Sequence, residues 1–145
     1  MLLIENKIEI NAPKERVWQV TVDVEAWPKW SSAMKHIQRE DAGEFKLGSS
    51  ALIKQEGMPQ TRWTVTDLST GNHFTWKGKA LGTDMTATHI LTPANDCTVT
   101  SVLRIELEGL LITLLGPIIN LLVAKSLKAE NQGLKQFCES LKPLS

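Results

Sequence analysis

The segment NHFTWKGKALGTDMTATHILT, residues 72–92, decides the fold class of this chain. Thr, Ile and aromatic residues alternate with other side chains over residues 72–79 and again over residues 84–92, which is typical of strands. Leu81-Gly82-Thr83 separates the two runs, and a connection this short joins neighbouring antiparallel strands. The segment therefore predicts a β-hairpin.

The same pattern continues on both sides of this hairpin. Short runs rich in Thr, Val, Ile and Trp alternate with turn signals, and near the N-terminus isoleucines alternate with charged residues. No helical pattern separates the central runs, so an antiparallel meander is expected and a parallel α/β sheet is excluded. The further strands are expected near residues 3–10, 34–41, 49–55, 60–68 and 97–107.

Helices are expected at the two ends of this strand-rich region. Two short ones are predicted over residues 13–22 and 25–30. One long helix is predicted over residues 110–141, bent at Gly116-Pro117 because proline lacks a backbone donor. Its sheet-facing stripe, read from the i, i+3, i+4 spacing, is predicted to comprise Ile119, Leu122, Ser126, Ala129, Gly133, Phe137 and Leu141.

Length and composition indicate one globular domain over residues 1–145. Sixteen basic and 16 acidic residues give a net charge of 0, which argues against a nucleic-acid partner. Cys97 and Cys138 are interpreted as buried thiols in a reducing compartment, so a cytoplasmic location is expected. The apolar run at residues 110–124 is shorter than a membrane span, which needs about 20 residues. It is interpreted as a buried helix start, with transient membrane contact as the open alternative.

These elements predict an α+β fold in which a curved sheet of six or seven antiparallel strands wraps around the C-terminal helix. One helix of about 10 Å diameter cannot fill a broad concave sheet, so a cavity for a small apolar molecule is expected. Its candidate ligand-binding residues on the sheet and short helices are Trp30, Trp63, Val65, Phe74, Trp76, Met85, Ala87, His89 and Leu91. On the long helix they are Leu122, Ser126, Ala129 and Gly133.

His89 is the candidate for chemistry, because it shares the predicted inner face with Met85 and Ala87. Such a histidine could orient a ligand or act as a general base, or it could simply be a hydrogen-bonded wall residue. The three histidines have no metal-ligand spacing, so no metal is predicted. The sequence also contains no nucleophile elbow and no phosphate-binding loop, and no cofactor is expected.

Several local patterns resemble the START/Bet v 1-like (SRPBCC) superfamily, in its bacterial polyketide cyclase/dehydrase-like branch. They are Ile8-Glu9-Ile10-Asn11-Ala12-Pro13 followed by Val17-Trp18, then Trp27-Pro28-Lys29-Trp30, Gly48, Phe74-Thr75-Trp76-Lys77-Gly78 and His89-Ile90-Leu91-Thr92-Pro93. The resemblance covers nearly the whole chain and implies a helix-grip fold with an internal pocket. It implies a pocket more strongly than an activity, because one fold supports many functions.

Three functions therefore remain open. The first is binding of a lipid, an isoprenoid or an aromatic, polyketide-like molecule. The second is a cyclase or dehydratase that uses His89. The third is a protein–protein interaction module, for which an exposed apolar patch around residues 110–115 would be the sign. The oligomeric state is not predicted.

Overall fold

The computed structural model describes residues 1–141, and its elements follow the predicted order. The sheet strands are β1 (Leu2–Ile10), β2 (Met34–Arg39), β3 (Ser50–Gln55), β4 (Thr61–Ser69), β5 (His73–Ala80), β6 (Thr83–Asn95) and β7 (Thr98–Glu108). The helices are α1 (Lys14–Val22), the short 3-10 helix η1 (Val24–Lys29) and α2 (Leu110–Ser140).

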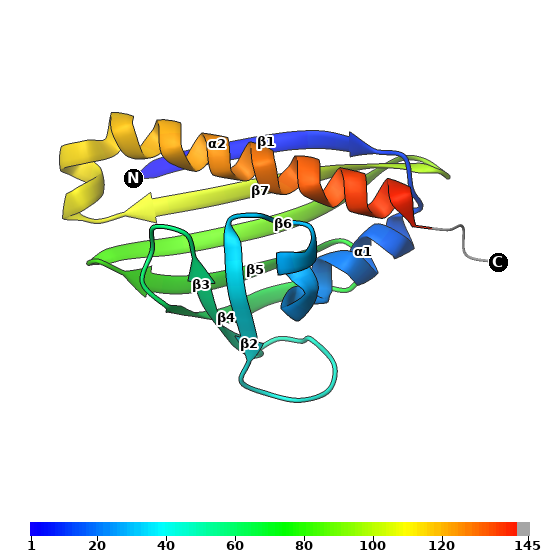
Figure 1. Ribbon diagram of the computed structural model, residues 1–145, viewed down its shortest axis with the longest axis horizontal. Helices are drawn as coiled ribbons and strands as arrows, with labels where there is room; N and C mark the ends of the chain where they lie inside the picture. The colour runs from blue at the N-terminus through cyan, green and yellow to red at the C-terminus, as the bar shows by residue number, and fades with distance from the viewer. Residues whose placement is uncertain (142–145) are drawn as a thin grey trace.

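All seven strands form one antiparallel sheet in the order β1-β7-β6-β5-β4-β3-β2. The predicted hairpin is confirmed as β5 and β6, in which Phe74 lies opposite His89 and Trp76 lies opposite Ala87. The sheet curves around α2, as Figure 1 shows. The α+β helix-grip architecture predicted from the sequence is therefore confirmed.

Helix α2 covers only one side of the concave face. It packs chiefly along β1 and makes fewer contacts with β7 and β6. At the opposite edge of the concave face, η1 packs against β2 (Figure 1). The middle of the concave face therefore has no helix directly on it, and this is the space in which the cavity lies.

The buried stripe of α2 differs from the predicted one. It comprises Ile112, Gly116, Leu127, Asn131, Leu134 and Cys138, so over the second half of the helix it is displaced by one position from the predicted stripe. The reason is Asn131, a polar residue that is fully buried because its side chain is satisfied. Its Nδ2 donates to Asn6 Oδ1 at 2.8 Å, and its Oδ1 accepts from Ser101 Oγ at 2.9 Å.

The predicted bend in α2 is present, centred on Leu115, whose φ of −121° and ψ of 18° are not helical. Leu115 directly precedes Gly116-Pro117, where proline interrupts the hydrogen-bond ladder. The prediction that the apolar run at residues 110–124 is buried was wrong. This part of α2 is kinked and extends beyond the sheet, so only one of its sides packs against other residues. The exposed large side chains are Leu110, Leu114, Leu115, Ile118, Leu121 and Leu122.

By length and composition, α2 also meets the criteria for a membrane-spanning helix. It has 31 residues, and an 18-residue window with a mean hydropathy of 2.0 is only 17% buried. Core helices of globular domains meet the same criteria. This window is mostly exposed, and only the second half of α2 packs as a core helix, with Leu127, Leu134 and Cys138 buried.

The two cysteines have different environments. Cys138 is buried as predicted, and burial raises the pKa of its thiol to about 12. Cys97 is exposed in the turn between β6 and β7, so the prediction that it is buried was wrong. A turn residue has no neighbouring layer to cover it, whatever the usual preference of cysteine for the interior.

Candidate functional site

A cavity of about 610 Å³ lies between the concave face of the sheet, η1 and α2. Its sheet wall comes from β2 to β7, its floor from α2, and one end is formed by the β3–β4 and β5–β6 turns. Residues that line it are mostly apolar and include Trp27, Met34, Ile53, Met58, Trp63, Trp76, Leu81, Met85, Leu103, Leu107, Ile112, Ile119 and Val123. The predicted cavity is therefore present in the predicted place.

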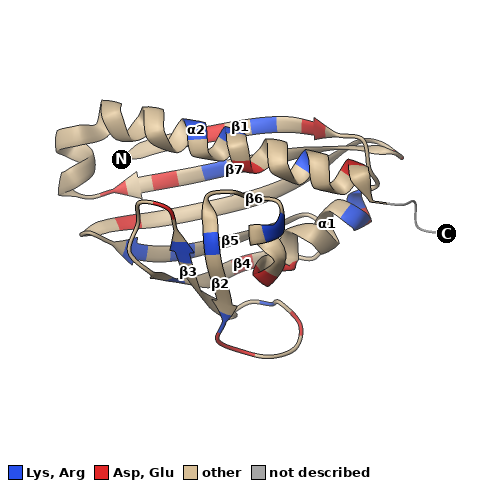
Figure 2. Ribbon diagram, in the orientation of Figure 1, with Lys and Arg blue, Asp and Glu red and all other residues tan. Residues whose placement is uncertain are grey.

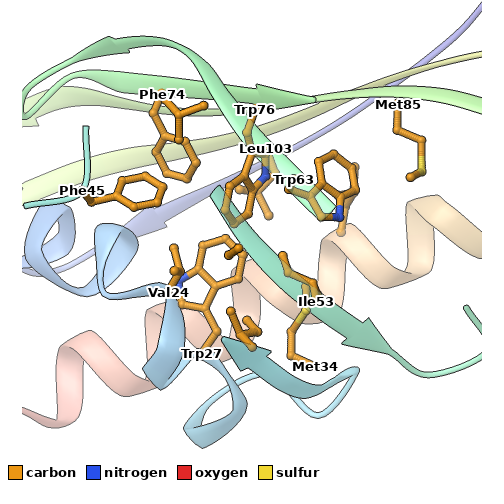
Figure 3. Close-up of a cluster of buried hydrophobic side chains, with 14 of the residues drawn as sticks. Val24, Trp27, Met34, Phe45, Ile53, Trp63, Phe74, Trp76, Met85 and Leu103 are labelled. Atoms are coloured by element: carbon orange, nitrogen blue, oxygen red, sulfur yellow. The ribbon is translucent and has the colours of Figure 1, made fainter. Parts of the chain in front are cut away.

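Three tryptophans form an aromatic wall in this cavity. The ring centroids of Trp27 and Trp76 are 5.5 Å apart, and those of Trp63 and Trp76 are 5.9 Å apart. Figure 3 shows the three rings gathered between the sheet and η1. Gly78 makes room for Trp63 across the β4–β5 pair, since a Cβ at Gly78 would lie 3.1 Å from the Trp63 ring.

Eight of the 13 predicted ligand-binding residues line the cavity. On the sheet, the alternation of β4, β5 and β6 turns their side chains to the concave face, and on α2 they lie beside the buried stripe. Their role in binding a ligand stays a prediction. They are Trp63, Trp76, Met85, Ala87, His89, Leu122, Ser126 and Ala129.

The other five predicted residues do not line the cavity. Val65 and Phe74 are buried in the main core beside Phe45, and Leu91 belongs to a smaller core cluster under α1 and the end of α2. Trp30 and Gly133 meet each other instead. A Cβ at Gly133 would lie 2.1 Å from the Trp30 carbonyl oxygen, so this glycine allows the end of η1 to approach α2 closely.

Sequence reasoning missed Trp27 and Glu130 as lining residues. The Trp27-Pro28-Lys29-Trp30 pattern carried a signal, but it did not tell which tryptophan faces inward. Trp27 is fixed by its Nε1, which donates to the Thr21 carbonyl at 3.1 Å. Glu130 falls outside the sheet-facing stripe that was predicted for the long helix, and the observed stripe is displaced from that one.

His89 is held among aromatic rings. It stacks on Phe74 with 4.6 Å between ring centroids and an interplanar angle of 11°, and the Trp27 ring centroid lies 5.2 Å away. Burial disfavours the charged imidazolium and lowers the pKa of His89 to about 3. At neutral pH the ring is therefore uncharged, and it offers one donor and one acceptor.

Glu130 is a carboxyl group on the wall of an apolar cavity. Its side chain keeps some accessible surface because the cavity lies next to it, yet protein surrounds it. Burial therefore raises the pKa of Glu130 to about 7. Within residues 1–141, neither a hydrogen bond nor an ion pair to this carboxyl is formed.

Thr83 is a further polar residue of the cavity wall. Its hydroxyl is buried and has no hydrogen-bond partner in the described part of the chain. Among residues 1–141, no group of three His, Cys, Asp or Glu side chains lies close enough to hold a metal ion. The site can therefore enclose an apolar body and meet it with a few isolated polar groups.

A family profile described as "Polyketide cyclase / dehydrase and lipid transport" matches residues 1–142. A comparison with curated protein sequences gives no significant match. Many solved structures share the fold, among them a START superfamily protein from Mycobacterium smegmatis. That pair has a TM-score of 0.84 at 15% identity and covers 97% of this chain and 99% of the other.

Two enzymes are also similar in fold. The Zhui aromatase/cyclase from Streptomyces sp. R1128 has a TM-score of 0.79 at 14% identity, covering 94% of this chain and 93% of its own. Norcoclaurine synthase from Thalictrum flavum has a TM-score of 0.73 at 11% identity, covering 98% and 88%. Identities this low show a shared fold alone. The profile match over nearly the whole chain establishes that this chain belongs to the polyketide cyclase/dehydrase and lipid transport family.

Proposed function

We propose that this protein binds a small hydrophobic molecule, such as a lipid, an isoprenoid or an aromatic, polyketide-like compound, in the cavity between sheet and helix. The observation that carries the proposal is the cavity itself, about 610 Å³ and walled by three tryptophans. Ligand pockets commonly measure about 300–1,000 Å³ and are mostly apolar. Burying a ligand there would contribute about 25 cal/mol per Å² of apolar surface.

Native mass spectrometry of the protein purified from its host tests this proposal. We expect a bound species that is lost on denaturation. Ala87→Phe should abolish binding, since Ala87 lines the cavity and a phenyl ring would occupy it. Thr86→Phe is the matched control, because Thr86 is the neighbouring residue on the opposite face of β6. An unliganded mass, together with no uptake of lipid or aromatic probes, would overturn the proposal.

The exposed apolar side of α2 supports a route by which such a ligand enters. Figure 2 shows no charged residue on the first half of α2, and charged residues begin at Lys125. Leu114 and Leu121 are 69% and 75% exposed, whereas Leu111, Ile119 and Val123 on the same helix line the cavity. We infer that this face contacts a lipid bilayer, because the apolar surface is continuous with the cavity wall.

Sedimentation with phosphatidylcholine vesicles tests this contact. The double variant Leu114→Ser/Leu121→Ser should reduce the vesicle-bound fraction several-fold, whereas Thr113→Ser, a conservative change at a neighbouring exposed position, should leave it unchanged. If the wild type does not bind vesicles and instead forms a dimer that the double variant disrupts, the exposed apolar face of α2 is an interface between two copies of the chain.

A cyclase or dehydratase is the second candidate, favoured by the presence of two titratable groups, His89 and Glu130, whose pKa values burial shifts in one cavity. A general base works best when its pKa is near the working pH. Glu130, with a pKa of about 7, fits this requirement better than His89, with a pKa of about 3. If the protein turns over a poly-β-ketone substrate, Glu130→Gln should lower kcat more than His89→Gln does. The reverse result would return the role to His89.

A further inference from the structure

The charged groups around the cavity are arranged unevenly. Besides His89, the titratable residues that line it are Glu56, Arg104, Lys125 and Glu130. Arg104 is engaged outside the cavity, since its Nε donates to Glu5 Oε2 at 2.8 Å. Lys125 and Glu56 are exposed, and Glu56 lies near Lys35. Glu130 is therefore the one acidic group that protein surrounds in this lining.

No buried cation balances this carboxyl among the lining residues described. His89 shares the cavity but stays neutral, because burial in the aromatic cluster disfavours its charged form. Burial also holds the pKa of Glu130 near 7, so above neutral pH the empty cavity contains an unpaired carboxylate. A buried carboxylate without a partner is costly, and a positively charged ligand group would relieve that cost.

The rest of the wall also suits a cation. The Trp76 ring lies beside both the Trp27 and the Trp63 rings, with centroid distances of 5.5 and 5.9 Å. Aromatic faces attract ammonium groups, and the attraction grows when the cation is removed from water. An anionic head group such as a fatty-acid carboxylate would meet aromatic faces and Glu130, both of which repel it.

We propose that the natural ligand is an apolar amine and that Glu130 is the counter-ion that recognises its ammonium group. This deepens the proposed function and rests on it, because it selects one class among the apolar molecules that the cavity could hold. The apolar body would lie against the aromatic and aliphatic wall, and the ammonium group would donate hydrogen bonds to the Glu130 carboxylate.

Three probes of equal chain length test the proposal: decylamine, 1-decanol and decanoic acid. Binding is followed at pH 8 and about 0.15 M salt, conditions that ionise both amine and acid, through the fluorescence of the cavity tryptophans. We expect decylamine to bind at least tenfold more tightly than 1-decanol and decanoic acid to bind most weakly. Glu130→Gln should remove the preference for the amine and leave 1-decanol binding within about twofold.

Glu15→Gln is the matched control, since it makes the same chemical change at an exposed position on α1 outside the cavity lining. Equal binding of all three probes, or an amine preference that survives Glu130→Gln, would overturn the amine proposal while leaving hydrophobic binding intact. Failure of every probe, 1-decanol included, would count against both this proposal and the proposed function. Circular dichroism of each variant establishes that it is folded.

Discussion

His89 and Glu130 line the same cavity, and burial shifts their pKa values in opposite directions. The folded protein binds a proton at His89 less well than the unfolded chain does, because the pKa falls from 6.5 to about 3. The stability that neutral His89 contributes is therefore present above about pH 6.5 and lost as the pH falls. At Glu130 the pKa rises from 4.5 to about 7, so its contribution is present below about pH 4.5 and lost as the pH rises through 7.

These two dependences oppose each other between pH 7.5 and pH 5, and single variants should separate them. Glu130→Gln should lose about 2 kcal/mol of unfolding free energy on going from pH 7.5 to pH 5, because of the two groups only His89 then responds, whereas in the wild type the two contributions largely cancel. His89→Phe should shift in the other direction over the same range. Urea unfolding of the ligand-free protein at both pH values measures this, and parallel curves for all three proteins would contradict it.

At Gly133, α2 closely approaches the backbone of Trp30, the residue that follows η1. A Cβ there would lie 2.1 Å from the Trp30 carbonyl oxygen, and a backbone atom cannot rotate away as a side chain would. Gly133→Ala should therefore destabilise the fold by about 1–3 kcal/mol, although alanine is the better helix former by about 1 kcal/mol.

Gly116→Ala is the matched control in the same helix. A Cβ at Gly116 would meet no other heavy atom within 4 Å, leaving out the neighbouring residues and the helix backbone. This variant should destabilise the fold less than Gly133→Ala does in thermal unfolding, because the restriction it adds is the local one that Pro117 places on the residue before it. If Gly133→Ala is equally well tolerated, the close approach of η1 is not a constraint on stability.

At the scale of the elements, one polar residue fixes how α2 lies on the sheet. Asn131 connects the helix to both β1 and β7, through Asn6 and Ser101. Its amide can satisfy these two groups in one register of the helix only, since a shift along the axis would separate all three.

Asn131→Leu should cost about 2–3 kcal/mol, although leucine is apolar and the site is buried. The change leaves the Ser101 hydroxyl and the Asn6 side chain without their partner in the interior, which costs more than the lost bonds alone. Gln132→Leu, at the adjacent exposed position, should change the free energy of unfolding by less than about 0.5 kcal/mol. Chemical denaturation measures both, and similar losses would mean that the Asn131 contacts contribute nothing specific.

At the scale of the whole molecule, α2 contributes buried residues to two separate core clusters. Ile112 and Leu127 belong to the larger cluster, which includes the cavity tryptophans, and Leu134 and Cys138 belong to the smaller one under α1. Neither cluster is complete without the helix, so we expect the chain to unfold as one cooperative unit.

Urea unfolding followed by tryptophan fluorescence and by far-ultraviolet circular dichroism should therefore give the same midpoint. A ligand at 100 times its Kd should raise the unfolding free energy by about 2.7 kcal/mol and shift both signals together. Two separate transitions would show instead that α2 detaches before the sheet unfolds.

Much of the site could be predicted because a strand turns alternate side chains to opposite faces. Once residues 72–92 were recognised as a hairpin, Trp76, Met85, Ala87 and His89 had to share a face, and the structure has them on the cavity wall. The same reasoning placed Phe74 and Leu91 on that face correctly. Periodicity does not tell how far along the strand the cavity extends, so both proved to be core residues beyond its end.

The helix was harder to predict, because its stripe is defined by a polar residue. In a sequence, a buried asparagine looks the same as an exposed one. Asn131 can be recognised as buried only from its partners on β1 and β7. The buried stripe is displaced by one residue from the predicted one. Glu130 was therefore not predicted to line the cavity, since a charged residue beside the stripe is normally solvated. Similarly, the sequence of residues 110–124 does not tell which of the leucines are buried against other residues and which are exposed.

The sequence by itself determined the order of the elements, the antiparallel sheet, the bend before Pro117 and the existence of a cavity. Alternation, turn residues and the missing donor of proline act locally, and the size of one helix limits what it can fill. Only the tertiary structure decided that Trp27 and Glu130 face the cavity and that leucines of α2 face outward. Those outcomes depend on contacts between residues far apart in the chain, which no local pattern records.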